Sequence, residues 1–280
     1  PGCRRPSRAN QSIGGASLSQ RVLPVGDQFV GRGALAPAHF GCGADGDETA
    51  QAGRHRPSML SLLYPLDATV DGYTREQFHT EAMGRFDEPL LAPDPRTRRI
   101  LETDRWTAYD VVLDVFPELF AWGVLVVPRD IQPGERRAVV VCQHGRNGVP
   151  RDTIDADSSA YNNFAARLAE RGFVTFAPHN LYRGEDRYRW LDRKANTVKA
   201  TLFSFIIAQH DQILRWLETL PFVDGDRIAF YGLSYGGETA VRVPTILEKY
   251  CLSICSGDFN QWTRKVASTD QPFSFMRTIE

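Results

Sequence analysis

The chain has 280 residues, of which 42% are hydrophobic and 24% charged, so it can bury a substantial core. A formal net charge of −1 argues against nucleic acid or an acidic membrane surface as its main partner. Five cysteines, an odd number without a CxxC pair, argue against a disulfide framework or a zinc site, and we expect no cofactor. We recognise no signal peptide and no run of 18 apolar residues, so a cytoplasmic protein is expected.

The first third of the chain carries little regular pattern. Residues 1–58 are rich in Gly, Ser, Arg and Ala without a helical or strand period, which predicts an irregular or disordered extension. Residues 59–108 form a lead-in, with a short helix that buries Phe78 and Met83 and then a linker punctuated by proline, "EPLLAPDPRTRR". The regular core is expected over residues 109–280.

From residue 109 onward, strand patterns alternate with helix patterns. The expected elements are a hairpin over 109–128, buried strands over 136–145, 173–178, 227–232 and 251–257, and helices over 161–171, 195–220 and 235–249. This alternation predicts an α/β fold whose mostly parallel sheet is flanked by helices. Cys251 and Cys255, in the last apolar run, are expected to be small core residues.

One turn in the core has the pattern of a catalytic nucleophile. Residues 232–236, "GLSYG", match G-x-S-x-G between an apolar strand and a helix, which is the context of a nucleophile elbow. The two flanking glycines are needed because larger side chains would collide with the adjoining strand and helix. The helix that follows directs its first N–H groups toward the site and favours a developing negative charge. Ser234 is therefore the predicted nucleophile.

A second motif follows the strand expected at residues 136–145. The sequence "HGRNG" begins with His144 and lies where an oxyanion loop is required. The predicted oxyanion donors are two backbone N–H groups, those of Tyr235 and Arg146. His144 is expected to brace this loop through side-chain hydrogen bonds.

Together these motifs resemble the α/β-hydrolase superfamily, in particular its bacterial branch of dienelactone-hydrolase-like and acetyl-esterase-like proteins. The resemblance covers residues 109–257. It implies a sheet of eight strands, of which about six can be counted here, and a catalytic order of serine, acid and histidine. Dienelactone hydrolases proper use cysteine as the nucleophile, so Ser234 points to ester hydrolysis.

The histidine base that the resemblance implies is missing from its usual place. All six histidines precede Ser234, and the 46 residues after it contain none, so a truncated C-terminus is the simplest expectation. Asp258 is a candidate acid, but the resemblance implies a commoner position for the acid after a later strand, and an aspartate that caps a turn is the favoured alternative. His179 is a less favoured substitute base; it and Arg183 are candidates for lining the substrate pocket.

The sequence thus predicts a serine carboxylic-ester hydrolase that forms an acyl-enzyme on Ser234 with a small to medium ester. Two alternatives stay open: a serine peptidase of the prolyl-oligopeptidase type, and an impaired hydrolase fold that acts by binding or assembly. The expected partner is a small-molecule ester, without nucleic acid, metal or membrane. An exposed last strand would also favour homo-oligomers.

Overall fold

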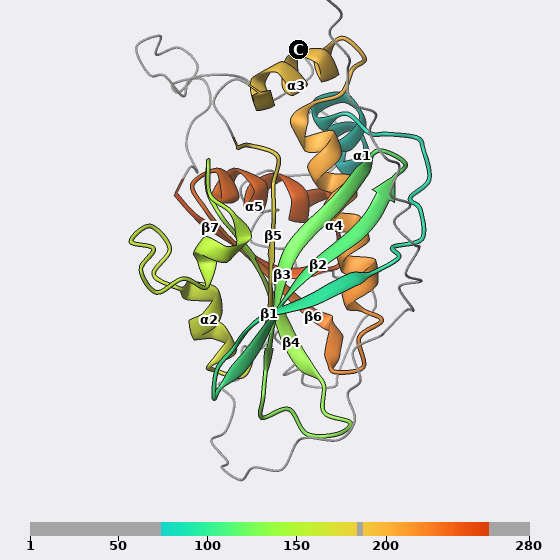
Figure 1. The fold of residues 1–280 in the computed structure, drawn as a ribbon. Coiled ribbons are helices and arrows are strands. Elements are labelled where there is room, and N and C mark those ends of the chain that lie inside the picture. The colour runs from blue at the N-terminus through green and yellow to red at the C-terminus, as the bar shows by residue number, and fades with distance from the viewer. Residues whose placement is uncertain (1–73, 184–186, 258–280) are drawn as a thin grey trace, which may run out of the picture.

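The computed structural model describes residues 74–183 and 187–257, which form one mixed sheet with helices on both faces (Figure 1). Its strands are β1 (Arg96–Glu102), β2 (Trp106–Phe116), β3 (Leu119–Pro128), β4 (Arg137–Gln143), β5 (Val174–Pro178), β6 (Val223–Leu233) and β7 (Tyr250–Ser256). They lie in the order β1-β2-β3-β5-β4-β6-β7. The pairs from β1 to β5 are antiparallel, whereas β5, β4, β6 and β7 run parallel. The predicted α/β fold is confirmed.

The helices cover the two faces of this sheet. They are α1 (Arg75–Gln77), the π-helix η1 (Phe78–Met83), the 3-10 helix η2 (Pro150–Thr153), α2 (Phe164–Ala169), α3 (Arg187–Asn196), α4 (Leu202–Leu217) and α5 (Tyr235–Ile246). One core cluster packs α4 and α5 against the sheet, and a second cluster packs the alanines of α2 against its other face (Figure 1). Met83 is buried in the first cluster, as predicted.

The predicted linker over residues 88–99 is wrong from Arg96 onward, because β1 begins there and pairs with β2. This strand is largely exposed, so its sequence shows none of the apolar alternation that marks a buried strand. Polar contacts link it to β2 instead, for example the hydrogen bond between Arg96 Nη2 and Asp114 Oδ1 at 2.5 Å. The sequence count of strands was low by this one.

The helix expected over 195–220 is shorter, because α4 spans Leu202–Leu217, and a separate helix, α3, ends at Asn196. Lys199, between them, has a left-handed φ of 56°, which a continuous helix cannot contain. Thr201 then caps α4 by accepting a hydrogen bond from the N–H of Phe203 at 3.1 Å. The expected apolar face is otherwise in place, because Ile206 and Ile213 are buried.

The last strand, β7, differs from the fully buried strand that was expected. Among the described strands its sole neighbour is β6, and Leu252 and Ile254 are 37% and 41% exposed. Cys251 is exposed, so its assignment to the core is wrong, whereas Cys255 is partly buried against the core. An apolar run in the sequence cannot distinguish a central strand from an edge strand.

Two further expectations concern the N-terminal extension and membrane-spanning helices. The predicted irregular extension over 1–58 lies outside the described residues. Within the described ranges, none of the helices combines the length and the apolar character that crossing a membrane requires.

Candidate active site

Ser234 lies in the turn that joins β6 to α5. Its backbone has φ 57° and ψ −117°, a conformation that is strained for a residue with a side chain. Its N–H donates a hydrogen bond of 2.9 Å to the carbonyl oxygen of Ser256 at the end of β7, and its side chain is exposed. The turn therefore presents an accessible hydroxyl on a fixed backbone, as the motif predicts.

The two glycines of the motif have no room for a side chain. A Cβ atom at Gly232 would lie 1.8 Å from the carbonyl oxygen of Gly236. A Cβ atom at Gly236 would lie 2.5 Å from the carbonyl oxygen of Gln143 and 2.8 Å from that of His144. These contacts show that α5 begins directly against the end of β4, which is the reason for the small residues in the turn.

The loop after β4 touches the serine. A Cβ atom built on Gly145 would lie 3.2 Å from Ser234 Cβ and 3.1 Å from the carbonyl oxygen of Leu233. Arg146 follows in this loop, and Tyr235 is the first residue of α5 on the other side of the serine. The structure thus brings together the segments that carry the two predicted oxyanion donors. Their role as donors stays a prediction.

His144 braces this loop, as expected, and is not placed to act as a base. Its Nδ1 lies 2.7 Å from the carbonyl oxygen of Gly145, and its Nε2 lies 3.2 Å from the backbone nitrogen of Asn180. These partners require Nδ1 to carry the proton and Nε2 to accept. Burial lowers the pKa of His144 to about 3, so the ring stays neutral at ordinary pH.

A buried polar network extends this brace into the core. The Asn180 amide donates to the hydroxyls of Tyr182 at 2.7 Å and Thr239 at 3.1 Å. Its Oδ1 lies 3.4 Å from Nε2 of His210, whose Nδ1 lies 2.8 Å from the hydroxyl of Tyr250. His210 is fully buried, and desolvation lowers its pKa to about 3, so the ring stays neutral within this network.

His179 and Arg183 lie at the carboxyl end of β5, beside this loop. The His179 ring packs near the rings of Trp122 and His144, with centroid distances of 5.2 and 5.5 Å. Burial and then the charge of Arg183 lower the pKa of His179 to about 4. Arg183 itself is exposed. The structure therefore places both residues near the loop, and their contact with substrate stays a prediction.

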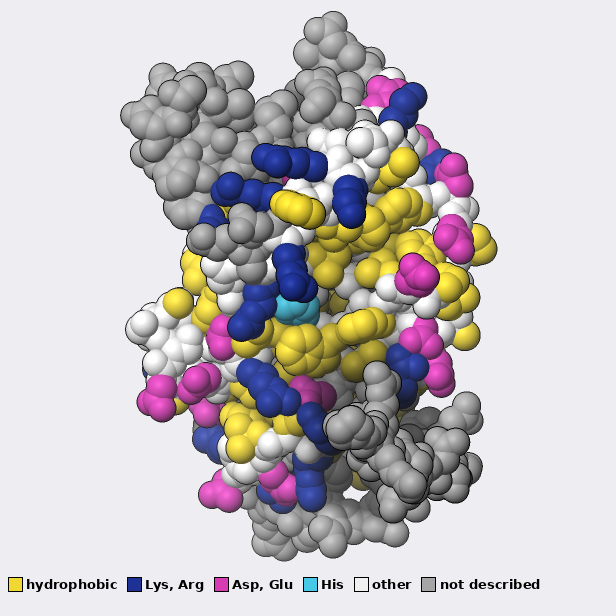
Figure 2. All heavy atoms as spheres, turned by 45° about the horizontal axis from the view of Figure 1, so that its top comes forward, with side chains coloured by type: hydrophobic (Ala, Val, Ile, Leu, Met, Phe, Trp, Pro, Cys, Tyr) yellow, Lys and Arg dark blue, Asp and Glu magenta, His cyan; other side chains and the backbone are white. Residues whose placement is uncertain are grey.

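The face seen in Figure 2 is basic along its middle. Lys and Arg side chains follow a band down this face, with histidine surface inside the band and hydrophobic side chains beside it (Figure 2). Acidic side chains lie mostly toward the two sides of this view. A positive band of this kind favours polar or anionic ligands over cationic ones.

Two parts of the predicted machinery are not found in the described residues. Asp258, the candidate acid, lies outside them. The histidine base is the second part, because within residues 74–183 and 187–257 no histidine is hydrogen-bonded to Ser234. The same ranges contain no group of three potential metal ligands.

Comparison with known families adds one finding. Residues 123–249, a little under half of the chain, match the model of the dienelactone hydrolase family. This segment is similar to that family. It runs from within β3 to Lys249 and so contains the loop after β4, the end of β5 and the Ser234 turn. The resemblance to the α/β-hydrolases is confirmed.

Several solved structures that are similar to this chain are named as esterases. One, provisionally described as an acetyl xylan esterase from Bacteroides fragilis, is 18% identical with a TM-score of 0.49, over 57% of this chain and 47% of that one. The acetyl xylan esterase from Paenibacillus sp. R4 is 20% identical with a TM-score of 0.48, over 66% of this chain and 59% of that one. The chain therefore spans about half the length of these structures. No curated protein matches its sequence.

The sequence analysis missed one residue that contacts the loop after β4. Tyr161 was expected to begin a helix, but α2 begins at Phe164, and Tyr161 lies in the turn before it. Its hydroxyl oxygen accepts a hydrogen bond of 2.9 Å from the N–H of Gly145. No local pattern could have shown this contact, because it joins residues 16 positions apart in the chain.

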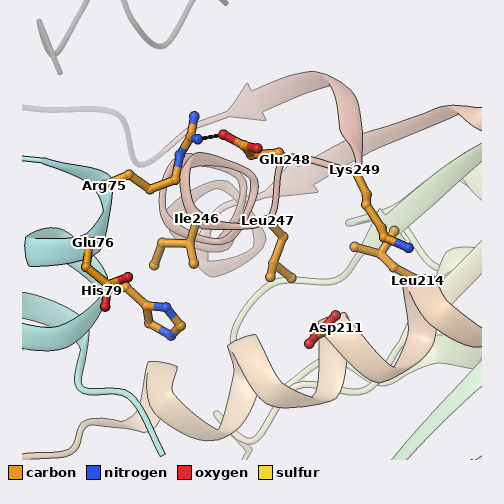
Figure 3. Close-up of a pocket in the computed structure, with 9 residues that line it drawn as sticks. All are labelled: Arg75, Glu76, His79, Asp211, Leu214, Ile246, Leu247, Glu248 and Lys249. Atoms are coloured by element: carbon orange, nitrogen blue, oxygen red, sulfur yellow. Dashed lines mark ion pairs between the residues drawn. The ribbon is translucent and has the colours of Figure 1, made fainter. Parts of the chain in front are cut away.

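A hollow of about 500 Å³ elsewhere in the structure is distinct from this site (Figure 3). It lies at the C-terminal end of α5, whereas Ser234 caps the N-terminal end of the same helix, about 18 Å away for 12 residues. Its charged groups already have partners. Arg75 forms an ion pair with Glu248 (Figure 3), and Asp211 forms one with Arg215, on the same helix. It offers no unsatisfied charge to a ligand.

Proposed function

We propose that this chain is a serine carboxylic-ester hydrolase that acts on small to medium esters through an acyl-enzyme on Ser234. The observation that carries the proposal is the Ser234 turn itself. An exposed serine with a strained backbone stands at the N-terminus of α5, in contact with the loop after β4. The match of residues 123–249, which include this turn, to the dienelactone hydrolase family supports ester hydrolysis.

The chemistry assigned to the site is acyl transfer in two steps. Ser234 Oγ attacks the ester carbonyl carbon, its proton passes to a base, and the alkoxide leaves with a proton. Water then attacks the acyl-enzyme and releases the acid and the free serine. In both steps the carbonyl oxygen becomes negative, and the N–H groups of Tyr235 and Arg146 are proposed to donate to it.

The base that accepts the Ser234 proton has to be chosen among the described histidines or lie outside the described residues. His144 and His210 are unsuitable, because both ring nitrogens of each are engaged in buried hydrogen bonds. His179 has a buried Nδ1 without a hydrogen-bond partner among the described residues, and its position at the end of β5 suits a pocket residue. Asp258 follows β7 and Gly257 directly, and we retain it as the acid that would orient a histidine base.

A fluorophosphonate probe tests the nucleophile. We expect covalent labelling of the wild-type chain and turnover of p-nitrophenyl acetate, and loss of both in Ser234→Ala. The matched control is Ser159→Ala, which removes an exposed hydroxyl outside the turn and leaves labelling intact. A wild-type chain that is neither labelled nor active would refute the proposal and favour a hydrolase fold that works by binding.

The choice of substrate distinguishes the esterase from the peptidase alternative. A prolyl-oligopeptidase type of enzyme would cleave peptide amides after proline, whereas the proposed esterase would cleave short acyl esters and leave such amides intact. Hydrolysis of both kinds of substrate with similar kcat/KM would contradict the esterase assignment.

A further inference from the structure

Tyr161 brings a hydroxyl group to the position where the oxyanion loop meets the nucleophile. The point at which Gly145 would carry a Cβ atom lies 3.2 Å from Ser234 Cβ and 3.4 Å from the Tyr161 hydroxyl oxygen. Ser234 Cβ and the Tyr161 hydroxyl oxygen are therefore both neighbours of Gly145. At this separation a carbonyl group bound to Ser234 Oγ would come within reach of the phenol.

The Tyr161 hydroxyl accepts one hydrogen bond, which orients it, and its own proton is available to donate a second. Its oxygen accepts from the N–H of Gly145 at 2.9 Å. In the described part of the chain, no acceptor for the Tyr161 proton lies within hydrogen-bonding distance. Burial raises the pKa of Tyr161, so the phenol stays protonated and able to donate at neutral pH.

The surroundings fix the phenol in this place. A Cβ atom on Gly148 would lie 2.4 Å from the Tyr161 oxygen, so the glycine at this position makes room for the hydroxyl. The Tyr161 ring packs near Phe164 at a centroid distance of 6.3 Å, and Phe164 packs on Tyr231 of β6 at 4.9 Å. The phenol is therefore tied both to the oxyanion loop and to the strand that carries Ser234.

The geometry points to Tyr161 as a side-chain oxyanion donor, whose O–H donates to the carbonyl oxygen that becomes negative when Ser234 attacks an ester. This inference rests on the proposed function. No proton is transferred to or from Tyr161 in this role; the O–H only shortens its hydrogen bond as negative charge develops. Such a donor stabilises the transition state more than the bound ester, so it acts on kcat rather than KM.

The test is Tyr161→Phe in the full chain, measured after the wild type has been shown to react at Ser234. Removing one oxyanion donor typically costs about 10²–10³ in kcat. We expect a loss of about 100-fold in kcat for p-nitrophenyl acetate with KM within twofold, and an equal weakening of inhibition by phenylboronic acid, which forms a tetrahedral adduct on serine. Tyr109→Phe, which removes a partly buried hydroxyl on β2, is the matched control and keeps the wild-type kcat.

A second variant tests whether the position of the Tyr161 hydroxyl, and not only its presence, affects kcat. Gly148→Ala keeps the phenol but places a methyl group against its oxygen, and we expect a similar fall in kcat. An unchanged kcat in Tyr161→Phe would overturn the inference. So would a fall in kcat accompanied by a lower melting temperature and unchanged boronate affinity, which would mark Tyr161 as merely structural. Failure of the wild type to react at Ser234 refutes the proposed function instead, so the two failures are distinguishable.

Discussion

The backbone N–H of Asn180 and the ring of His144 are joined by a hydrogen bond of 3.2 Å. Through this bond the end of β5 holds the loop that follows β4, because the other ring nitrogen of His144 is bonded to the Gly145 carbonyl in that loop. The orientation of the loop after β4 therefore depends on two buried residues, His144 and Asn180. The Asn180 side chain extends the same support into the buried network.

Asn180→Ala should weaken the fold and the site together. The substitution leaves the buried hydroxyls of Tyr182 and Thr239 and the ring of His210 without their amide partner, at a cost of about 1–3 kcal/mol in the free energy of unfolding. Urea unfolding and turnover of p-nitrophenyl acetate measure the two effects. Gln132→Ala, at an exposed position, should change stability by less than about 0.5 kcal/mol. Equal stability of the two variants would contradict this account.

Gly236→Ala should disturb the contact between α5 and β4. The new methyl group would overlap the carbonyl oxygens of Gln143 and His144, and overpacking of this kind costs about 1–3 kcal/mol. Because the same contact positions the loop after β4, where we propose an oxyanion donor, fluorophosphonate labelling should slow as well. The control is Gly225→Ala, whose methyl group would meet only the flexible side chain of Glu218, with Cγ at 3.2 Å. Wild-type labelling in Gly236→Ala would show that the site tolerates the shift.

Stability should decrease as the pH is lowered from 7 toward 5. His144 and His210 have folded-state pKa values of about 3, below the usual value of 6.5, so the unfolded chain takes up protons that the folded chain refuses. The two neutral histidines contribute fully to the free energy of unfolding above pH 6.5. This contribution decreases by up to about 1.4 kcal/mol per pH unit for each histidine as the pH falls toward about 3.

Chemical denaturation at pH 7, 6 and 5 measures this slope. His210→Gln keeps a polar side chain without a titrating ring, so its free energy of unfolding should change less steeply with pH than that of the wild type. The same slope in both proteins would mean that His210 does not stay neutral in the folded state.

The exposed strand β7 should mediate self-association. It has one neighbouring strand among those described, and it exposes Leu252 and Ile254, which makes it able to pair with the same strand of a second copy. We expect concentration-dependent dimers in sedimentation experiments and their loss in Ile254→Lys. Val198→Lys, at another exposed apolar position, should leave the dimer unchanged. A wild-type chain that is monomeric at all concentrations would exclude this interface.

The sequence by itself determined the features that depend on local chemistry. Gly232, Ser234 and Gly236 stand close together in the chain, and the strain and crowding of one turn demand their spacing. The alternation of strands and helices likewise predicted the α/β fold. Where burial was absent, as in β1, the pattern failed, because hydrophobic periodicity reports which residues are buried and not which backbones pair.

Only the tertiary structure decided which distant side chains meet. The sheet order β5-β4-β6 places the carboxyl ends of three strands side by side, and this brings Asn180 to His144 and the Gly145 loop to Ser234. Tyr161 joins them from a turn that has no motif of its own. Such contacts depend on how strands are ordered and helices packed, and that order depends on the long-range pairing of the whole sheet rather than on any short stretch of residues.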